Sequence, residues 1–168
     1  MANEEQLGLL RAGVDHWNHW RALNSHVAID LSGADLSHAN LSDINLAHAN
    51  LDEVDLCKAD LQGANLSGAN LHVANLSHAN LSHANLKQAS LQVANLDKAN
   101  LRKADLDMAN LSWAGLIRAN LMEANLHEAN LHEANLSSAN LYRAILTKAK
   151  LEGTNLRGAI LPDGSLHY

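Results

Sequence analysis

A leucine stands at every fifth residue of this chain, from Leu31 to Leu166, without a break in register. The residue two places before each leucine is usually Ala, and the residue between them is usually Asn or Asp, as in Ala39-Asn40-Leu41. Self-similarity at a fixed period is typical of repeat architectures. A period of five forms no stripe along an α-helix, and on a continuous strand it would place successive leucines on opposite faces. Neither regular element alone can bury this pattern.

The pattern fits a chain in which each five-residue unit, or pentad, is a short extended segment followed by a corner. With leucine at position i, the leucine and the Ala at i−2 point the same way, and the Asn or Asp at i−1 points the opposite way. The residues at i+1 and i+2 then turn the chain. Repetition winds the backbone into coils with Leu and Ala inside, stacked as parallel strands about 4.8 Å apart. The sequence therefore predicts a parallel β-helix, although the spacing alone does not choose between three and four sides.

The repeated Ala-(Asn/Asp)-Leu-X-X motif covers about five-sixths of the chain. It closely resembles the signature of the pentapeptide-repeat family. The resemblance implies an all-β solenoid, a right-handed quadrilateral parallel β-helix with four pentads per coil. The 28 leucine positions then give about seven coils, a rod about 34 Å long at the spacing of parallel strands.

The residues before the repeat follow helical spacing instead. Asn3 can act as the N-cap of a helix, with Gln6 reaching back to it. Residues 4–22 are therefore predicted to form one amphipathic helix. Its apolar positions are Leu7, Leu10, Val14 and Trp17, with Trp20 or Arg21 next.

We expect this helix to cap the N-terminal end of the solenoid. Without a cap, the first coil would expose its leucines and its unpaired strand edges. The segment from Trp17 to Arg21 is similar to N-terminal extensions of some pentapeptide-repeat proteins, which favours a cap over docking of a partner or a membrane. The polar face is also too mixed in charge for a membrane helix: it carries Arg11, Asp15, His16, His19 and Arg21.

The repeat departs most from its pattern near its C-terminal end. Ile145, Lys150 and Ile160 replace the usual Asn or Asp at i−1, either because these coils form an interface or because the repeat is being capped. The segment that begins with Leu161-Pro162 is a turn signal. The chain thus divides into a capping helix and connector at 1–27, a pentapeptide-repeat β-helix at 28–161, and a turn and tail at 162–168.

Composition limits the classes of function. The chain has 168 residues, which suits one domain, and its net charge of −6 argues against direct binding of nucleic acid. The single Cys57 cannot form an internal disulfide, so a reducing compartment is expected. The acidic start lacks the pattern of a secretory signal, and no apolar run is long enough to span a membrane. We therefore expect a soluble, cytoplasmic protein.

If a coil holds twenty residues, positions twenty apart stack on the outside of the rod. One i+2 column reads Gly33, Glu53, Val73, Val93, Trp113, Glu133 and Gly153. Val73, Val93 and Trp113, here called the apolar strip, would lie exposed and contiguous, with Met108 and Ile117 on the neighbouring sides. A contiguous apolar patch can mark a contact site. Alternatively, β-branched and aromatic residues simply stabilise a strand surface.

A second i+2 column carries positive or titratable groups. This basic column consists of His38, Lys58, His78, Lys98 and Arg118. It could serve an anionic partner or could be an ordinary solvated face. In contrast, the five acids at i−1 are expected to bond the local backbone: they are Asp30, Asp35, Asp55, Asp60 and Asp105.

Metal, cofactor and catalytic sites are not expected. His127 and His132, like His78 and His83, lie five residues apart, and outward positions around a corner diverge instead of converging on a metal. The sequence carries no glycine-rich phosphate loop and no nucleophile elbow. An interior filled by Leu and Ala also leaves no pocket in which a pKa could be shifted. We therefore expect no enzymatic activity.

Three functions are compatible with such a rod. The leading hypothesis is a non-enzymatic scaffold that presents ladders of side chains to an unidentified protein partner. The resemblance also raises a nucleic-acid mimic that binds, inhibits or protects DNA gyrase, but here acidic and basic side chains alternate, whereas mimicry needs continuous acidic rows. The third is self-association, in which a monomer pairs end to end into a dimer or associates through Trp113.

Overall fold

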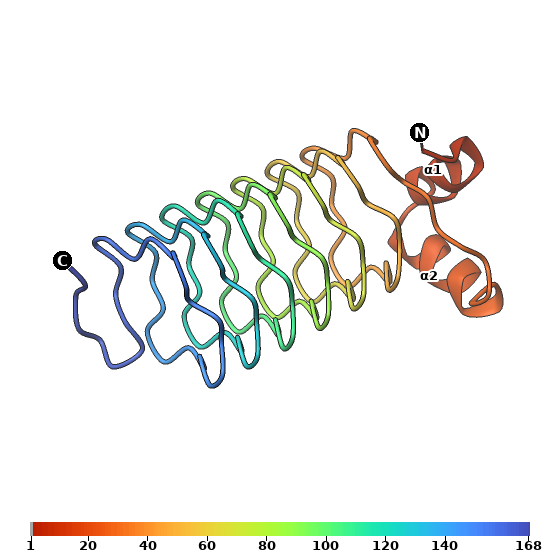
Figure 1. The fold of residues 1–168 in the computed structure, drawn as a ribbon. Helices are drawn as coiled ribbons and strands as arrows, with labels where there is room; N and C mark the ends of the chain where they lie inside the picture. The colour runs from red at the N-terminus through yellow and green to blue at the C-terminus, as the bar shows by residue number, and fades with distance from the viewer. Residues whose placement is uncertain (1) are drawn as a thin grey trace.

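The repeat forms an elongated, four-sided rod in the computed structural model, which describes residues 2–168 and so leaves out Met1 of the predicted capping segment (Figure 1). Two helices lie at the N-terminal end of the rod, and the C terminus lies at the other end (Figure 1). Residues twenty apart pair in parallel, from Asp30 with Asn50 to Asn140 with Ile160. Four pentads therefore make one coil.

Each pentad places its side chains as the alternation predicts. In a central pentad, Ala84 and Leu86 are buried while Asn85 reaches the surface. The Leu86 N–H donates to the Asp105 carbonyl of the next coil at 2.7 Å, and the Asp105 N–H donates to the Ala84 carbonyl at 2.9 Å. These paired bonds repeat along the rod, so the coils are held together by a parallel backbone ladder.

A tight turn follows each leucine. In the same pentad, the N–H of Ala89 donates to the carbonyl of Leu86 at 3.1 Å. Every i+2 residue from Gly33 to Gly158 has a positive φ, and 21 of these residues are not glycine. A positive φ at the third residue is the mark of a type II turn. The i+2 columns are therefore made of turns and not of strands.

The core is one narrow column of Leu and Ala that runs along the rod axis. Ile44 and Val54 take the place of Ala at i−2 in the first coils and are fully buried. Thr154 fills the same position near the C-terminal end, where its hydroxyl donates to the Leu131 carbonyl at 2.8 Å. The core column accommodates these three substitutions at i−2, and the coils around them keep the same pairing of residues twenty apart.

The capping segment is two helices, so the prediction of one helix over 4–22 is wrong. Helix α1 spans Glu4–Arg11 and helix α2 spans Val14–Leu23. Between them, Gly13 has a φ of 109°, a conformation that other residues rarely adopt. The helical spacing of apolar residues continues across this break, which is why periodicity did not reveal it. Neither α1 nor α2, the helices of the described residues, is long and apolar enough to cross a membrane.

The apolar residues of the two helices cover the first coil. Leu7, Leu10 and Trp17 are buried, and Val14 and Trp20 are partly buried against the core. Asn3 caps α1 as predicted, because its side chain accepts the N–H of Gln6 at 3.1 Å. However, the side chain of Gln6 bonds elsewhere, and Arg21, which was assigned to the polar face, is buried.

The C-terminal end of the winding is open. The Leu161 N–H donates to the Ser165 carbonyl at 2.8 Å, and the tail pairs antiparallel with the last coil at Ile160 and Leu166. Leu166 is 47% exposed, so the last leucine of the register lies outside the core and the winding stops short of seven full coils. Leu151 is also exposed at this end.

Candidate functional site

The cap pairs the open backbone edge of the first coil through side-chain amides. Gln6 Nε2 donates to the Ala28 carbonyl at 2.9 Å, and Gln6 Oε1 accepts the Asp30 N–H at 2.8 Å. Gln6 thus gives the Asp30 N–H the acceptor that a preceding coil would supply, and the Asn3 N–H donates to the Asp30 carbonyl at 2.8 Å. Sequence reasoning assigned Gln6 to the helix cap and missed this role, although its place beside Leu7 and Leu10 on the buried face was a signal.

Helix α2 repeats this arrangement on the adjoining side. Asn18 Nδ2 donates to the Asp43 carbonyl at 3.0 Å, and its Oδ1 accepts the Asn45 N–H at 2.8 Å. Trp17 Nε1 donates to the Asn45 carbonyl at 2.8 Å. The guanidinium of Arg21 donates to a further set of carbonyls: those of Asn24, Ser25, Val27 and Ala47. The cap is therefore a polar seal as well as an apolar cover.

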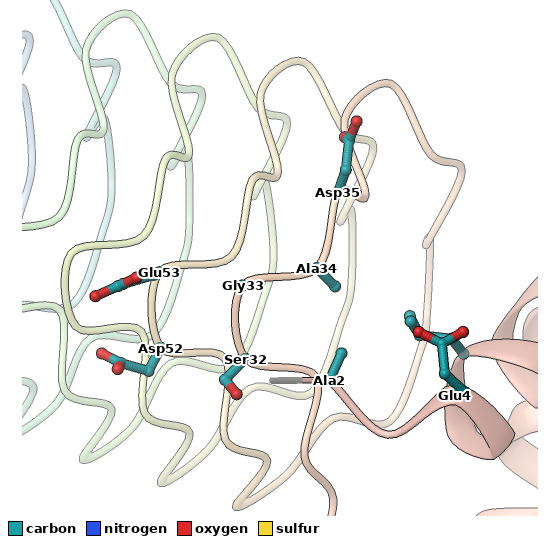
Figure 2. A pocket seen from close by; sticks show the side chains of 9 residues that line it. Ala2, Glu4, Ser32, Gly33, Ala34, Asp35, Asp52 and Glu53 are labelled. Atoms are coloured by element: carbon teal, nitrogen blue, oxygen red, sulfur yellow. The ribbon is translucent and has the colours of Figure 1, made fainter.

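A hollow lies where α1 meets the first coils (Figure 2). Its carboxylates are Glu4, Asp35, Asp52 and Glu53, and Figure 2 shows Asp52 and Glu53 pointing away from Asp35 and Glu4. The hydroxyl and the N–H of Ser37 hold the pKa of Asp35 below its ordinary value, so this carboxylate is engaged locally. The arrangement offers no convergent set of ligands or paired acid and base.

The acids at i−1 bond the local backbone, as predicted. Each of the five accepts the N–H two residues ahead at 2.9 to 3.2 Å. Asn residues at this position do the same, and many of them also donate to the side chain one coil before. Asn80, Asn100 and Asn120 form such a ladder, which begins at Asp60. These side chains hold the coils together, and their polar atoms are already engaged in hydrogen bonds within the rod.

Gly115 interrupts the i−1 pattern beside the apolar strip. It has no side chain to accept the N–H of Ile117, and Asp97 from the preceding coil accepts that N–H instead, at 2.8 Å. A Cβ at Gly115 would lie 3.1 Å from Asp97 Oδ1. Asp97 therefore takes the place of the missing Asn side chain, and the surface between Trp113 and Arg118 has no side chain at i−1.

The apolar strip is exposed, and its members lie in turns. Val73, Val93 and Trp113 are 43%, 51% and 58% exposed, with φ values of 56°, 61° and 63°. A left-handed backbone disfavours an L-residue by about 1–2 kcal/mol, and a β-branched residue there is an outlier. These residues therefore lie in turns and not on a strand surface, in a backbone conformation that does not favour them.

The two flanking apolar residues differ from each other. Met108 is 50% exposed on the corner before Trp113, whereas Ile117 is only partly exposed. The Trp113 ring stands edge-on to His132, with centroids 5.8 Å apart. Two shallow hollows, one beside Met108 and one beside Trp113, share the lining residues Asn130 and Lys150.

All members of the basic column are exposed, and all occupy left-handed turn positions. Within residues 2–168, neither Lys58 nor Lys98 nor Arg118 forms an ion pair. Several other cations on the rod are paired: Lys87 with Asp105 at 3.2 Å, Arg102 with Glu123 at 3.4 Å and Lys148 with Glu128 at 2.8 Å. The three permanent cations of the basic column, Lys58, Lys98 and Arg118, thus have no ion-pair partner among the described residues.

The histidines considered for metal binding lie on different corners. His127 Nδ1 is 2.9 Å from Asp107 Oδ1 in the preceding coil, and His132 Nδ1 is 4.0 Å from Glu152. Nowhere in the described part of the chain do three His, Cys, Asp or Glu side chains gather closely enough to hold a metal ion.

Comparisons with known proteins show which family the repeat resembles. The sequence model described as pentapeptide repeats matches in eight copies, over residues 29–68, 39–77, 58–92, 74–112 and 124–161. HetL from the cyanobacterium Nostoc sp. strain PCC 7120, which is involved in regulation of heterocyst differentiation, is 40% identical. The alignment covers 84% of this chain and 71% of HetL, with a TM-score of 0.56.

Two further solved structures are similar over most of the chain. Rfr23 from the cyanobacterium Cyanothece 51142 is 29% identical, with 82% of this chain and 92% of Rfr23 covered and a TM-score of 0.36. QnrB1, a plasmid-mediated fluoroquinolone resistance protein, is 22% identical, with 81% and 74% covered and a TM-score of 0.41. No curated protein matches the sequence significantly. Since the family match spans most of the chain and the identity to HetL is high, the chain belongs to the pentapeptide-repeat family.

Proposed function

We propose that this protein is a non-enzymatic scaffold that binds a protein partner through side chains on the outside of its rod. The observation that carries this proposal is the apolar strip, whose large side chains are exposed at turn positions that disfavour them. A contiguous exposed apolar patch often marks an interaction site. HetL acts in regulation, and binding another protein is one way to regulate.

The interior supports a role of this kind. Leu and Ala side chains fill the column from end to end, for example Leu66, Leu86 and Leu106 with no exposed surface. The side chains available for recognition therefore stand on the four corners and at i−1. Since the i−1 residues bond the backbone and one another, the corners carry the side chains that are free to vary and to bind.

The proposal is tested by affinity capture from the native host with three forms of the protein. The first is wild type, and the second replaces Val73, Val93 and Trp113 with Ser. The third is a matched control that makes three Ser substitutions at equivalent turns of another corner: His83, Lys103 and Glu123. We expect a specific partner to be lost from the second form and retained by the control. Equal capture by all three forms would mean that the strip binds no partner.

Self-association is a second candidate, because the C-terminal end is open. Leu151 and Ile160 are each 37% exposed there, and the tail pairs with the backbone of the last coil only near Gly158, Ala159 and Leu161. If this end joins two rods, Leu151→Glu should lower the mass measured by light scattering from dimer to monomer. Trp113→Glu should leave that mass unchanged. A wild type that is monomeric at high concentration excludes this candidate.

Action on DNA gyrase as a nucleic-acid mimic has less support. A mimic needs long acidic rows, whereas Glu123 lies within 4 Å of both Arg102 and Lys103, and Glu128 pairs with Lys148. We therefore expect neither inhibition nor protection in a gyrase supercoiling assay at micromolar protein. Inhibition in that assay would restore this alternative.

We propose that the protein works in a reducing compartment, the cytoplasm. Cys57 is the only cysteine in the sequence, so it forms no internal disulfide. Its thiol is partly buried and accepts from the Ser77 hydroxyl at 3.4 Å.

A further inference from the structure

The apolar strip and part of the basic column border the same face of the rod. In each of three consecutive coils, one turn carries a strip residue and the next turn, five residues later, carries a residue of the basic column. The pairs are Val73 with His78, Val93 with Lys98, and Trp113 with Arg118. Between the two rows lie the extended segments 74–76, 94–96 and 114–116. We call this three-coil surface the composite face.

The middle of the composite face is low. Its i−1 residues are Asn75, Asn95 and Gly115, which are short or lack a side chain. The Asn75 side chain donates to Asp55 at 2.9 Å and is held against the ladder. A partner that reaches between the two rows contacts both at the edges and meets the Asp97 carboxylate over Gly115 in the middle.

The charged edge of the composite face is available to a partner. Lys98 and Arg118 are exposed and form no ion pair within the described residues. The nearest acid in these coils is Asp97, whose Oδ1 accepts the Ile117 N–H. In the preceding coils, acids stand at i−1 close to the basic column, at Asp35 and Asp55. Lys98 and Arg118 thus outnumber Asp97, the acid that lies between the two rows in these coils.

The spacing of the rows favours one kind of partner. Successive coils lie about 4.8 Å apart, so each row offers one side chain per 4.8 Å. A helix laid along the rod advances about 5.4 Å per turn and can present one acid and one apolar side chain to each coil. Side chains on one face of an extended strand recur at about 6.6 Å, which differs more from the spacing of the coils. Over three coils, the side chains of a helix therefore stay closer to the side chains of the two rows than those of a strand do.

We propose that the composite face binds an acidic amphipathic helix of a partner protein, aligned with the rod axis. Its apolar side chains pack on Val73, Val93 and Trp113, and its carboxylates meet Lys98 and Arg118, with His78 at the end of the row. This proposal rests on the proposed scaffold function and names the class of partner.

The direct test uses a synthetic peptide and the full-length protein in a calorimetric titration. The peptide is about 18 residues long, or about five helical turns, with a row of Glu beside a row of Leu at helical spacing. A second peptide has the same composition with Glu at every second residue, which suits a strand. An oligothymidine of equal charge serves as a third probe. We expect binding of the helical peptide and at least about tenfold weaker binding of the other two.

Charge-reversal variants locate the binding surface. Lys98→Glu/Arg118→Glu should weaken binding of the helical peptide at least about tenfold. The matched control, Lys103→Glu/Arg143→Glu, makes the same change of charge at turns of another corner and should leave binding within about twofold. Circular dichroism melting checks that both variants remain folded.

Three results would overturn the proposal: no binding of the helical peptide to wild type, equal binding of the strand peptide or the oligothymidine, or equal weakening by the control variant. The scaffold function has its own readout, the loss of a captured partner from the strip-to-Ser form. If that loss occurs while the helical peptide does not bind, the scaffold function stands and the acidic helix is the wrong partner.

Discussion

Within one pentad, each residue position has its own physical task. Leu and the Ala two before it fill the column, the Asn or Asp between them bonds the backbone, and the i+2 residue takes a left-handed turn. The alternation of side chains in an extended segment predicted the first two tasks from the sequence. The third could not be predicted, because His, Lys, Glu and Val together fill more of the i+2 positions than Gly does, and their identity carries no signal of a positive φ.

Relief of this backbone strain gives a prediction for Val93. Asn tolerates a left-handed backbone better than a β-branched residue does, so Val93→Asn should raise the free energy of unfolding by about 0.5–1 kcal/mol. Gln88→Asn, at an equivalent turn with a φ of 57° but without a β-branched residue, should change it less. Urea denaturation measures both. A less stable Val93→Asn would mean that the strip serves folding after all.

The ion pair between Glu128 and Lys148 gives a prediction for pH. Hydrogen bonding to Lys148 lowers the pKa of Glu128 from its ordinary value of 4.5, and Glu128 raises the pKa of Lys148 from 10.5. The stabilisation from Glu128 is therefore complete above pH 4.5 and is lost as pH falls through its lowered pKa. The stabilisation from Lys148 is complete below pH 10.5 and is lost as pH rises through its raised pKa.

An NMR titration of the Glu128 carboxyl carbon checks this pair. In Lys148→Ala, the midpoint should move up to the ordinary range of a glutamate, because its main hydrogen-bond partner is gone. In Lys87→Ala, a lysine paired with Asp105 instead, the Glu128 midpoint should stay where it is in wild type. An unchanged midpoint in Lys148→Ala would show that the pair does not form in solution.

At the scale of the element, the cap illustrates what a sequence pattern can and cannot predict. Apolar residues at helical spacing predicted a helical cover and its buried face, with Leu7, Leu10 and Trp17 at its centre. The break at Gly13 and the roles of Gln6 and Asn18 escaped prediction. Their partners are backbone groups of the first coil, and these groups come together only when the coil has formed.

The two amides of the cap should act locally and independently. In Gln6→Ala, the N–H of Asp30 loses its acceptor, so its amide hydrogen exchange should speed up about tenfold, while Asn45 keeps its protection. Asn18→Ala should give the reverse result. Each variant is thus the control for the other in an NMR exchange experiment. Equal acceleration at both amides in either variant would indicate that the cap opens as one unit.

At the scale of the whole molecule, the rod has two different ends and unequal faces. The N-terminal end is covered by α1 and α2 (Figure 1). The C-terminal end exposes Leu151 and Leu166. The period of five, with four sides implied by family resemblance, was enough to predict which residues stack into columns. It could not predict that Lys98 and Arg118 lack acidic partners, because that depends on where neighbouring side chains reach.

The central claim is that a filled interior leaves only the outside of the rod for recognition. Thiol labelling along one pentad tests it most directly, with single cysteines placed at residues 84 to 88 in a Cys57→Ser background. The structure predicts slow labelling at 84 and 86, which are buried, and fast labelling at 87 and 88, which are exposed. If a folded variant labels at 86 as quickly as at 88, the interior is open to solvent and the claim is contradicted.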